Sequence, residues 1–399
     1  MRKKEPHIVY LGSIGFPHGL AEVQRVKLIS KALVEAGASV TVINRIGVHD
    51  PEGDLKFSKE GIHEGIRYVY ASGTPYRPRS FFRRNLLKVI GLINEIRILL
   101  TLHNNNQLDS AILSTMKFCS ALFYRFLSKI LKFPIYFNYV ELNSAISTRT
   151  SYGKRINDYL YEKYVFHLVE GVMPINDFLG DVVKRHSTNM PILKVPVLCD
   201  FERFKNVKQG GDKKYFLFCG GAGYLEIIEF ILKAFDLLMD NQTVALYLVA
   251  NGNPRQMSLL YNEIDKIKKK NLVQTFTNVT DAQIAELYVN AIGLLIPLRP
   301  TLQDEARFPH KIGEYSASGT PIITTNYGEV KKYFEDNVTA LITREYDINE
   351  FSNKMQFIIS CPEKAKAIGL NARSMGLENF DYRSYGKKLK AFVTRLEKT

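Results

Sequence analysis

Long apolar runs are missing from this 399-residue sequence, which has no uninterrupted stretch of the ~18 residues that a membrane-spanning helix needs. The start, MRKKEPHIVYLGS, holds only a short apolar run typical of a strand, so we expect no secretory signal. The four cysteines (Cys119, Cys199, Cys219 and Cys361) lie far apart without CxxC spacing. We therefore expect buried thiols in a reducing compartment, and a cytoplasmic protein.

Two ligand-binding motifs are also missing. The glycine loop after the first predicted strand, GSIGFPHGL at 12–20, lacks the GxGxxG spacing of dinucleotide-binding folds, so NAD is not an expected ligand. No nucleic-acid motif with interleaved aromatic residues is present. We therefore do not expect nucleic acid as a partner.

Positive charge, by contrast, is abundant, with a formal net charge of +14. Residues 1–200 carry 27 Lys and Arg against 17 Asp and Glu, whereas the rest of the chain carries 27 against 23. The excess lies in the first half. We therefore expect a negatively charged partner to meet that half.

The segment 305–325, EARFPHKIGEYSASGTPIITT, has the order loop, short helix and buried strand. Pro309 suits the first helical position and Gly319 the position just past the helix end. The helix start offers amides and a positive dipole end, which together with Lys311 suit a phosphate. Glu314, one turn further, could accept hydrogen bonds from a sugar hydroxyl. An incidental surface helix with a following strand is the alternative.

The order of predicted elements indicates an α/β protein with two Rossmann-like halves. The first begins with the strand 7–11 (HIVYL), the glycine loop, the helix AEVQRVKLISKALVEAG and the strand SVTVIN. A later strand, 134–143, carries Glu141 near its end, where open α/β sheets place ligand groups; a solvated glutamate is the alternative. A second series begins at 215–223 (YFLFCGGAG). Before it, the segment 192–214 has strand residues and then polar and glycine-rich ones, and we interpret it as the linker between the domains.

The glycine loop is a possible binding element of the first half. Gly15 and Gly19 would let the backbone approach a ligand closely. His18 between them could contact a substrate, or it could be a histidine in a solvated loop.

Two amphipathic segments, 76–101 and 121–133, combine basic and apolar residues. Core helices with solvated basic edges would explain them. The alternative, favoured by the charge of this half, is a surface that lies on an anionic membrane, where each Lys or Arg adds about 1 kcal/mol.

Five stretches, in the right order along almost the whole chain, resemble glycosyltransferase family 4. They are the glycine loop with the AEVQR helix, VPVLCDFERF, FCGGAG, FTNVTDAQIAELYVNAIGLLIPL and FPHKIGEYSASGTPII. The resemblance implies the GT-B fold, with two Rossmann-like domains facing across a cleft and a C-terminal helix crossing back. We therefore expect an acceptor domain at 1–200, a nucleotide-sugar donor domain at 201–378, and a C-terminal helix at 379–399 that packs on the first domain.

The resemblance also implies roles for individual residues. Glu314 matches the second Glu of the family's E-x7-E motif, which holds the ribose of the nucleotide, and Lys311 would neutralise phosphate. Phe308, Pro309 and His310 would line the sugar and diphosphate. Further donor-binding residues are Gly15 and Gly19 of the glycine loop, Gly221 of the FCGGAG loop, and Arg299.

The sequence departs from the family pattern at two places. Ala306 stands where the first Glu of E-x7-E is expected, with Glu305 one residue early. The FCGGAG loop lacks the family's Arg and Lys, for which Arg299, Arg307 and Lys311 are possible substitutes. The family uses no divalent metal, and the sequence contains no DxD motif, so we expect no metal cofactor.

The predicted function is retaining transfer of a hexose or N-acetylhexosamine from a UDP- or GDP-linked donor. The acceptor would be a hydroxyl of a lipid-linked or other saccharide in bacterial surface polysaccharide synthesis, reached by peripheral contact with the inner face of the cell membrane. Glu141 and His18 are the predicted catalytic residues on the acceptor side. Two alternatives are a sugar-nucleotide epimerase of GT-B fold and a non-enzymatic basic binding protein that kept the fold.

Overall fold

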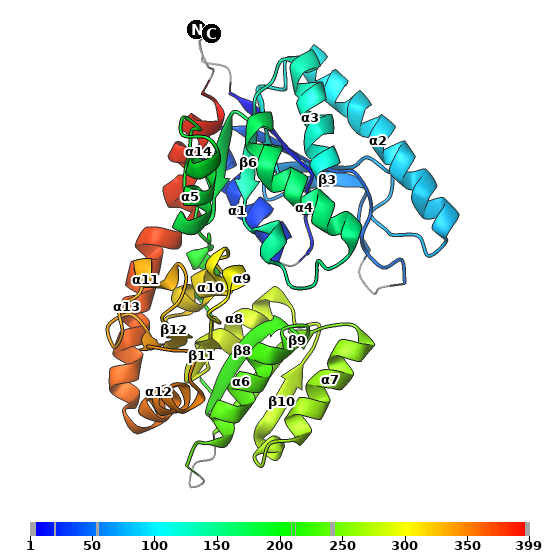
Figure 1. Ribbon diagram of the computed structural model, residues 1–399. Coiled ribbons are helices and arrows are strands. Elements are labelled where there is room, and N and C mark those ends of the chain that lie inside the picture. Colours follow the sequence, from blue (N-terminus) through cyan, green and yellow to red (C-terminus); the bar gives the residue numbers. More distant parts are fainter. Residues whose placement is uncertain are drawn as a thin grey trace. The chain divides into compact units, whose positions relative to one another are not determined.

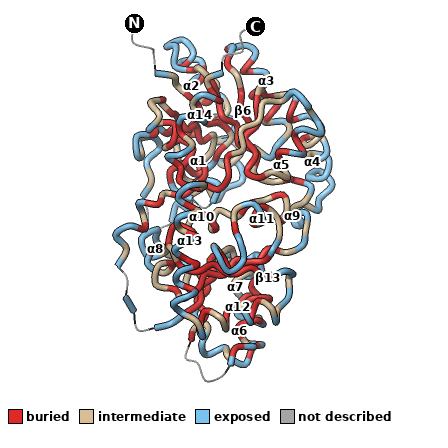
Figure 2. Tube along the Cα trace, turned by 90° about the vertical axis from the view of Figure 1, so that its left-hand side faces the viewer, coloured by how far each residue is buried: buried red, intermediate tan, exposed pale blue. Residues whose placement is uncertain are grey.

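The computed structural model describes residues 5–395 apart from residues 20, 53–55, 209, 212 and 240–243. The chain forms two compact units. Unit 1 comprises the chain up to Leu198 and the chain from Tyr382 onward, and unit 2 comprises Cys199–Asp381. The sheet of unit 1 is largely parallel and the sheet of unit 2 is wholly parallel. Helices cover both sheets, and the strands of both are largely buried (Figures 1 and 2).

Unit 1 contains a seven-stranded sheet in the order β3-β4-β2-β1-β5-β6-β7. All neighbours pair in parallel except β3 and β4, which form an antiparallel hairpin. The strands are β1 (His7–Leu11), β2 (Ser39–Asn44), β3 (Glu60–His63), β4 (Ile66–Tyr70), β5 (Ser110–Leu113), β6 (Ile135–Tyr139) and β7 (Gly171–Pro174).

The helices of unit 1 lie on the two faces of this sheet. Because crossovers between parallel strands are right-handed, α1 covers one face and α2, α3 and α4 cover the other. The helices are α1 (Ala21–Glu35), α2 (Phe81–Asn104), α3 (Phe118–Leu131), α4 (Tyr152–Tyr164), α5 (Asp177–His186) and α14 (Gly386–Val393).

Helix α1 buries the face that the sequence predicts, with Val23, Val26, Ile29 and Leu33 in the core. It also buries Arg25, which the sequence analysis does not single out. The Arg25 guanidinium donates to Asn138 Oδ1 and to the carbonyl oxygens of residues 195 and 196 at 2.7–2.8 Å. Burial lowers the pKa of this guanidinium to about 10, which still leaves it charged at neutral pH.

Helix α14 packs against α1 within unit 1. Lys390 Nζ donates to the carbonyl oxygens of Ala36 and Gly37 at 2.8 and 2.7 Å, directly beyond the end of α1. A cation at this end also meets the negative end of the helix dipole. Residues 396–399 of the predicted C-terminal helix lie outside the described residues.

Unit 2 contains a six-stranded parallel sheet in the order β10-β9-β8-β11-β12-β13. Its strands are β8 (Tyr215–Gly221), β9 (Ala245–Asn251), β10 (Val273–Phe276), β11 (Gly293–Ile296), β12 (Ile322–Thr325) and β13 (Leu341–Thr343). Its helices are α6 (Leu225–Asp236), α7 (Pro254–Asp265), α8 (Asp281–Val289), α9 (Leu302–Glu305), α10 (Lys311–Ser318), α11 (Val330–Tyr333), α12 (Ile348–Ser360) and α13 (Pro362–Phe380).

The predicted linker at 192–214 contains the point where the chain passes from unit 1 to unit 2, and it also contributes core residues to both units. Val195, Val197 and Leu198 are buried in unit 1, and Phe201 and Phe204 are buried in unit 2. These apolar side chains are core residues, because each packs into the unit to which it belongs.

Helix α10 begins at Lys311, two residues later than the prediction that put Pro309 at the first helical position. The Pro309 carbonyl instead accepts the Ile312 amide at 3.1 Å. Gly319 follows the helix with φ 76°, ψ 9°, the left-handed conformation expected from the sequence.

Substituting Gly319 by alanine is expected to destabilise the protein by about 1 kcal/mol, because an L-residue is strained at positive φ. The added Cβ would lie 3.6 Å from the nearest Arg373 atom, an ordinary contact, so no steric cost is added. Urea denaturation measures the change. The control is Gly153→Ala in α4, where nothing lies within 4 Å and no destabilisation is expected. Equal effects at both sites would contradict this explanation.

All four cysteines are free, but only Cys199 and Cys219 are buried. The prediction of buried thiols is wrong for Cys119, which is exposed, and for Cys361, which is intermediate. Cys119 lies in the first turn of α3. Among the described residues, no helix is both long and apolar enough to cross a membrane.

Candidate active site

In unit 1, the glycine loop between β1 and α1 places its glycines close to neighbouring chain. Gly15 has φ +93°, and a Cβ on Gly19 would come within 2.5 Å of Val23 Cγ2. The sequence analysis misses Gly12, which has φ +80° and where a Cβ would lie 2.3 Å from the Ser114 carbonyl oxygen. The exposed His18 has its ring 4.9 Å from that of Phe57. The loop conformation thus depends on several glycines.

Glu141 follows β6 at the carboxyl edge of the unit 1 sheet and is partly buried. Partial desolvation and the charge of Glu141 both raise the pKa of Glu22, in the first turn of α1. The structure therefore places a second carboxylate, Glu22, in the field of Glu141. Glu22 was not predicted as a site residue, although its position two residues after the glycine loop could have indicated one.

In unit 2, Glu314 is the centre of a polar cluster at the start of α10. Its carboxylate accepts from Lys311 Nζ at 2.9 Å, from Arg203 Nη1 at 3.3 Å and from the Tyr288 hydroxyl at 3.4 Å. Arg203 comes from the short helical turn 201–204, which Asp200 caps by accepting the Glu202 amide. The sequence analysis misses Arg203, although it lies in the family-like stretch VPVLCDFERF.

Charge pairing fixes the protonation states of this cluster. Burial by itself would lower the pKa of the Lys311 ammonium, but the Glu314 carboxylate raises it well above its ordinary value. Burial would raise the pKa of Glu314, but Lys311 and Arg203 hold it below its ordinary value. Lys311 and Arg203 place two cations beside Glu314, and the charge of Asp281 also raises the pKa of Arg203. The two cations lie at the positive end of the α10 dipole, which suits an anionic ligand.

A second cluster surrounds Asp304, a fully buried carboxylate in α9. Arg299 donates to Asp304 through Nε at 3.0 Å and Nη2 at 3.1 Å, and to Glu226 through Nη1 at 2.8 Å. These bonds to Asp304 raise the pKa of the Arg299 guanidinium above its ordinary value. Arg299, which the sequence predicts to bind the donor, thus has all three of its guanidinium nitrogens bonded to carboxylates within unit 2.

Arg307 shares Asp304 with Arg299 but is less fully bonded. Its Nη2 lies 2.7 Å from Asp304 Oδ1, and its guanidinium carbon lies 4.9 Å from the centre of the Tyr224 ring. Its buried Nε has no hydrogen-bond partner among the described residues. Tyr224 follows Gly221, the last residue of β8, so Arg307 lies beside the loop that lacks the family's Arg and Lys.

The remaining predicted residues lie around α10. Phe308 is buried, and its ring stacks on Tyr333 at 5.7 Å. His310 immediately precedes the helix and is partly buried. Ala306 is completely buried and directly follows α9.

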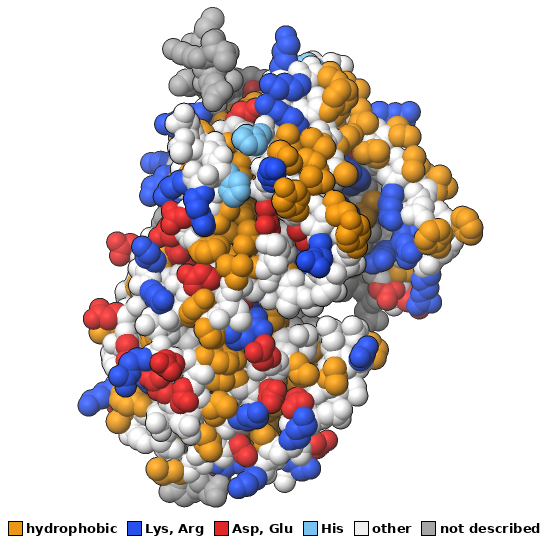
Figure 3. All heavy atoms as spheres, viewed as in Figure 1, with side chains coloured by type: hydrophobic (Ala, Val, Ile, Leu, Met, Phe, Trp, Pro, Cys, Tyr) orange, Lys and Arg blue, Asp and Glu red, His pale blue; other side chains and the backbone are white. Residues whose placement is uncertain are grey.

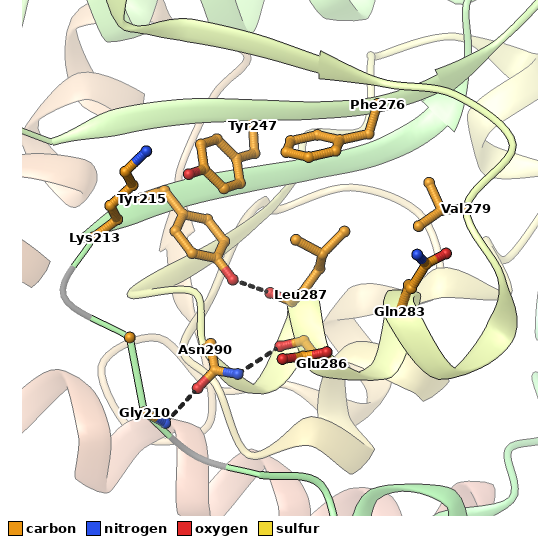
Figure 4. Close-up of a pocket in the computed structure, with 11 residues that line it drawn as sticks. Gly210, Lys213, Tyr215, Tyr247, Phe276, Val279, Gln283, Glu286, Leu287 and Asn290 are labelled. Carbon is orange, nitrogen blue, oxygen red and sulfur yellow. Dashed lines mark hydrogen bonds between the residues drawn. The ribbon is translucent and has the colours of Figure 1, made fainter.

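A cavity of about 390 Å³ lies elsewhere in unit 2 (Figure 4). The Tyr215 and Tyr247 rings stack in it at 4.0 Å, and the Tyr215 hydroxyl donates to the Leu287 carbonyl at 2.9 Å. Asn290 accepts the Gly210 amide at 2.9 Å. None of its lining residues is a predicted site residue. Of the described residues, no three or more His, Cys, Asp or Glu gather in a group suited to a metal ion.

Comparison with known proteins finds a family match for the part of the chain that carries both clusters. Residues 200–375 match the family model "Glycosyl transferases group 1". This segment is a glycosyl transferases group 1 domain. The match indicates a transferase enzyme. No match is found among curated proteins.

Solved structures show the fold of this glycosyltransferase as a whole. Sucrose-phosphate synthase from Thermosynechococcus elongatus superposes with a TM-score of 0.74 at 17% identity, covering 97% of each chain. The Anabaena protein Alr3699/HepE, in complex with UDP-glucose, gives a TM-score of 0.68 at 13% identity, over 98% of this chain and 100% of that one. WaaG, a glycosyltransferase involved in lipopolysaccharide biosynthesis, gives 0.64 at 15% identity, with the same coverage. The predicted GT-B fold is confirmed.

Proposed function

We propose that this glycosyltransferase moves a hexose or N-acetylhexosamine from a UDP- or GDP-linked donor to a hydroxyl acceptor with retention of configuration. The observation that carries the proposal is the positively charged start of α10, where Lys311 and Arg203 share Glu314. Structures of similar fold that hold UDP-glucose, or UDP and glucose, support a nucleotide sugar as the ligand. We assign no metal to the reaction.

Each cluster of unit 2 has a role in this proposal. Lys311, the positive end of the α10 dipole and Arg307 stabilise the leaving diphosphate, because they place positive charge where negative charge develops. Arg299 acts through Asp304, which holds the Arg307 guanidinium in place. Glu314 accepts hydrogen bonds from the ribose hydroxyls. The loop at Gly221 and the backbone at Phe308, Pro309 and His310 lie along the rest of the donor.

In the transfer, the bond between the sugar C1 and the diphosphate oxygen breaks, and the acceptor oxygen bonds C1 on the same face. The acceptor hydroxyl loses its proton, and the nucleoside diphosphate leaves. The residues proposed for the acceptor side are Glu141 and His18, with Gly15 and Gly19 shaping the loop. We propose a lipid-linked or other saccharide of bacterial surface polysaccharide synthesis as the acceptor, reached by peripheral contact with a membrane.

Product analysis tests this function. The purified protein is incubated with UDP- and GDP-sugars, with and without saccharide and lipid-linked acceptors, and the products are identified by NMR. A new glycosidic bond with the donor's anomeric configuration, formed only when acceptor is present, is the expected result. An epimerised sugar formed without acceptor would instead favour the sugar-nucleotide epimerase, and an inverted linkage would contradict retention.

A further inference from the structure

We propose that the exposed side of helices α2, α3 and α4 is a docking surface for an anionic lipid bilayer. This surface, called the α2–α4 face below, belongs to unit 1. The exposure, spacing and charge of the side chains on these three helices support this surface independently of sugar transfer.

Helix α2 carries an apolar stripe on its outer side. Phe82 is 84% exposed, Leu86 59%, Val89 55% and Ile93 45%. Their spacings of four, three and four residues put them on one side of the helix. The opposite side is buried and includes Glu95 and Leu99. Helix α2 is therefore apolar on its solvent side as well as towards the sheet, which packing in the core does not explain.

Helices α3 and α4 continue the pattern. Each presents apolar or aromatic side chains to solvent at spacings of three or four residues, which again share one side of the helix. They are Leu122, Phe126 and Ile130 on α3, which are 42%, 63% and 56% exposed, and Tyr152, Ile156 and Tyr159 on α4, which are 81%, 43% and 61% exposed.

The three helices lie side by side, so their stripes form one surface. Helix α3 bonds to α2 through the Tyr124 hydroxyl, which donates to Glu95 Oε1 at 2.8 Å. It meets α4 where the Phe118 amide donates to Asn157 Oδ1 at 3.0 Å. Figure 1 shows the helices on one flank of the unit 1 sheet, and Figure 3 shows apolar and basic side chains interleaved over that flank. Contiguous exposed apolar patches rimmed by charged residues are typical of interaction sites.

The charge on these helices is almost entirely positive. Of their acidic residues, Glu95 and Asp158 are buried and bonded, to Arg45 and Arg149 respectively, and Glu162 accepts from Ser144 at 2.9 Å. The basic residues are three times as many: Arg83, Arg84, Lys88, Arg97, Arg125, Lys129, Lys154, Arg155 and Lys163. The α2–α4 face therefore presents a positive field around its exposed aromatic rings.

This combination fits an anionic bilayer better than a second copy of the chain. A symmetric dimer would place the same basic residues of two copies near each other, and Glu162 is the one partly exposed acid on these three helices that could offset them. A bilayer takes the apolar stripes into its interface while Lys and Arg meet anionic headgroups. Helix α2, 24 residues long, would lie along such a surface, since no described helix can cross a membrane.

Vesicle co-sedimentation of the full chain tests the proposal. We expect binding to vesicles of phosphatidylcholine with about one-third phosphatidylglycerol, little binding to phosphatidylcholine alone, and release as salt rises to about 0.5 M. Replacing Lys88 and Lys129 by Gln should weaken partitioning about 30-fold, since each basic residue contributes about 1 kcal/mol. Replacing Phe82 and Phe126 by Ser should weaken it at least ~10-fold.

Matched controls use exposed residues of α13 in unit 2. Leu370→Ser with Leu377→Ser, which are 51% and 48% exposed, and Lys364→Gln with Lys366→Gln should leave partitioning unchanged. The proposal would be overturned if the α13 controls lost as much vesicle binding as the variants of the α2–α4 face. It would also be overturned if the variants of the α2–α4 face bound vesicles like the wild type, or if the wild-type protein did not bind them. So would a wild-type dimer that the Phe82 and Phe126 variant converts to monomer. Nucleotide binding in the absence of lipid, measured on the same samples, tests the proposed donor site separately.

Discussion

Substitution of Lys311 by methionine is expected to lower kcat/KM for sugar transfer by about 100- to 1000-fold, the usual cost of removing one preorganised group that stabilises developing negative charge. Lys311 lies at the first position of α10, where its charge adds to the positive end of the helix. Methionine keeps the length of the side chain but removes that charge. Initial rates at varied donor concentration measure the effect.

The variant should remain folded, because Glu314 keeps its bonds to Arg203 and Tyr288. Thermal unfolding checks this. Lys366→Met on α13, an exposed lysine of the same unit, is the matched control and should retain wild-type activity. A decrease of less than about threefold in the Lys311 variant would exclude it from stabilising the leaving group.

Substitution of Glu314 by glutamine is expected to raise the donor KM by about 10- to 100-fold, because hydrogen bonds to a charged acceptor contribute roughly 1.5–3 kcal/mol. A matched assay compares the intact nucleotide sugar with a donor whose ribose lacks the hydroxyls. The wild-type enzyme should lose affinity for the truncated donor, and the variant should lose much less. Equal losses in both enzymes would contradict a ribose-binding role.

The same substitution should change the pH dependence of transfer. In the wild-type protein Glu314 raises the pKa of Lys311, so the ammonium keeps its charge across the assay range. With glutamine, that attraction is gone, whereas burial and the charge of Arg203 remain and both lower the pKa of Lys311. The ammonium then loses its proton at a lower pH than in the wild type. The alkaline limb of the kcat/KM profile should therefore shift to lower pH, and an unchanged limb would contradict this coupling.

Local patterns in the sequence were enough to predict some elements. Val23, Val26, Ile29 and Leu33 recur with helical spacing and are buried on α1. Gly319 is left-handed after α10, as expected of a glycine that ends a helix. In both cases the residue's neighbours in the chain decide its conformation, so the sequence contains the necessary information.

Elements that depend on distant residues were missed. The hairpin of β3 and β4 turns at Glu64 and Gly65, with φ 48° and 79°. Glutamate is unusual at positive φ, and here its carboxylate is paired with Lys27 and Lys31 of α1. No pattern within the hairpin indicates those partners, because they lie more than thirty residues away in the chain.

The candidate site also combines contacts between residues close in the sequence with contacts between distant residues. Lys311 and Glu314 form an ion pair within one helical turn, and sequence spacing predicts their proximity. Arg203 reaches Glu314 from a residue 111 positions earlier, so only the folded unit brings them together. Likewise, the sequence predicts Arg299 as a donor-binding residue and offers Arg307 only as a possible substitute for the family's phosphate-binding residues. The structure distinguishes the two arginines, because all three guanidinium nitrogens of Arg299 are bonded to Asp304 and Glu226, whereas Arg307 Nε has no partner among the described residues.

Isothermal titration of the full chain with UDP and with GDP tests the donor site most directly. We expect one of the two to bind the wild-type protein with a dissociation constant below about 1 mM, and to bind the Lys311→Met variant at least ~10-fold more weakly. At a hundred times its dissociation constant, that nucleotide should also stabilise the wild-type fold by about 2.7 kcal/mol. If neither nucleotide bound at millimolar concentration, or if the variant bound as well as the wild type, the start of α10 would not be the donor site.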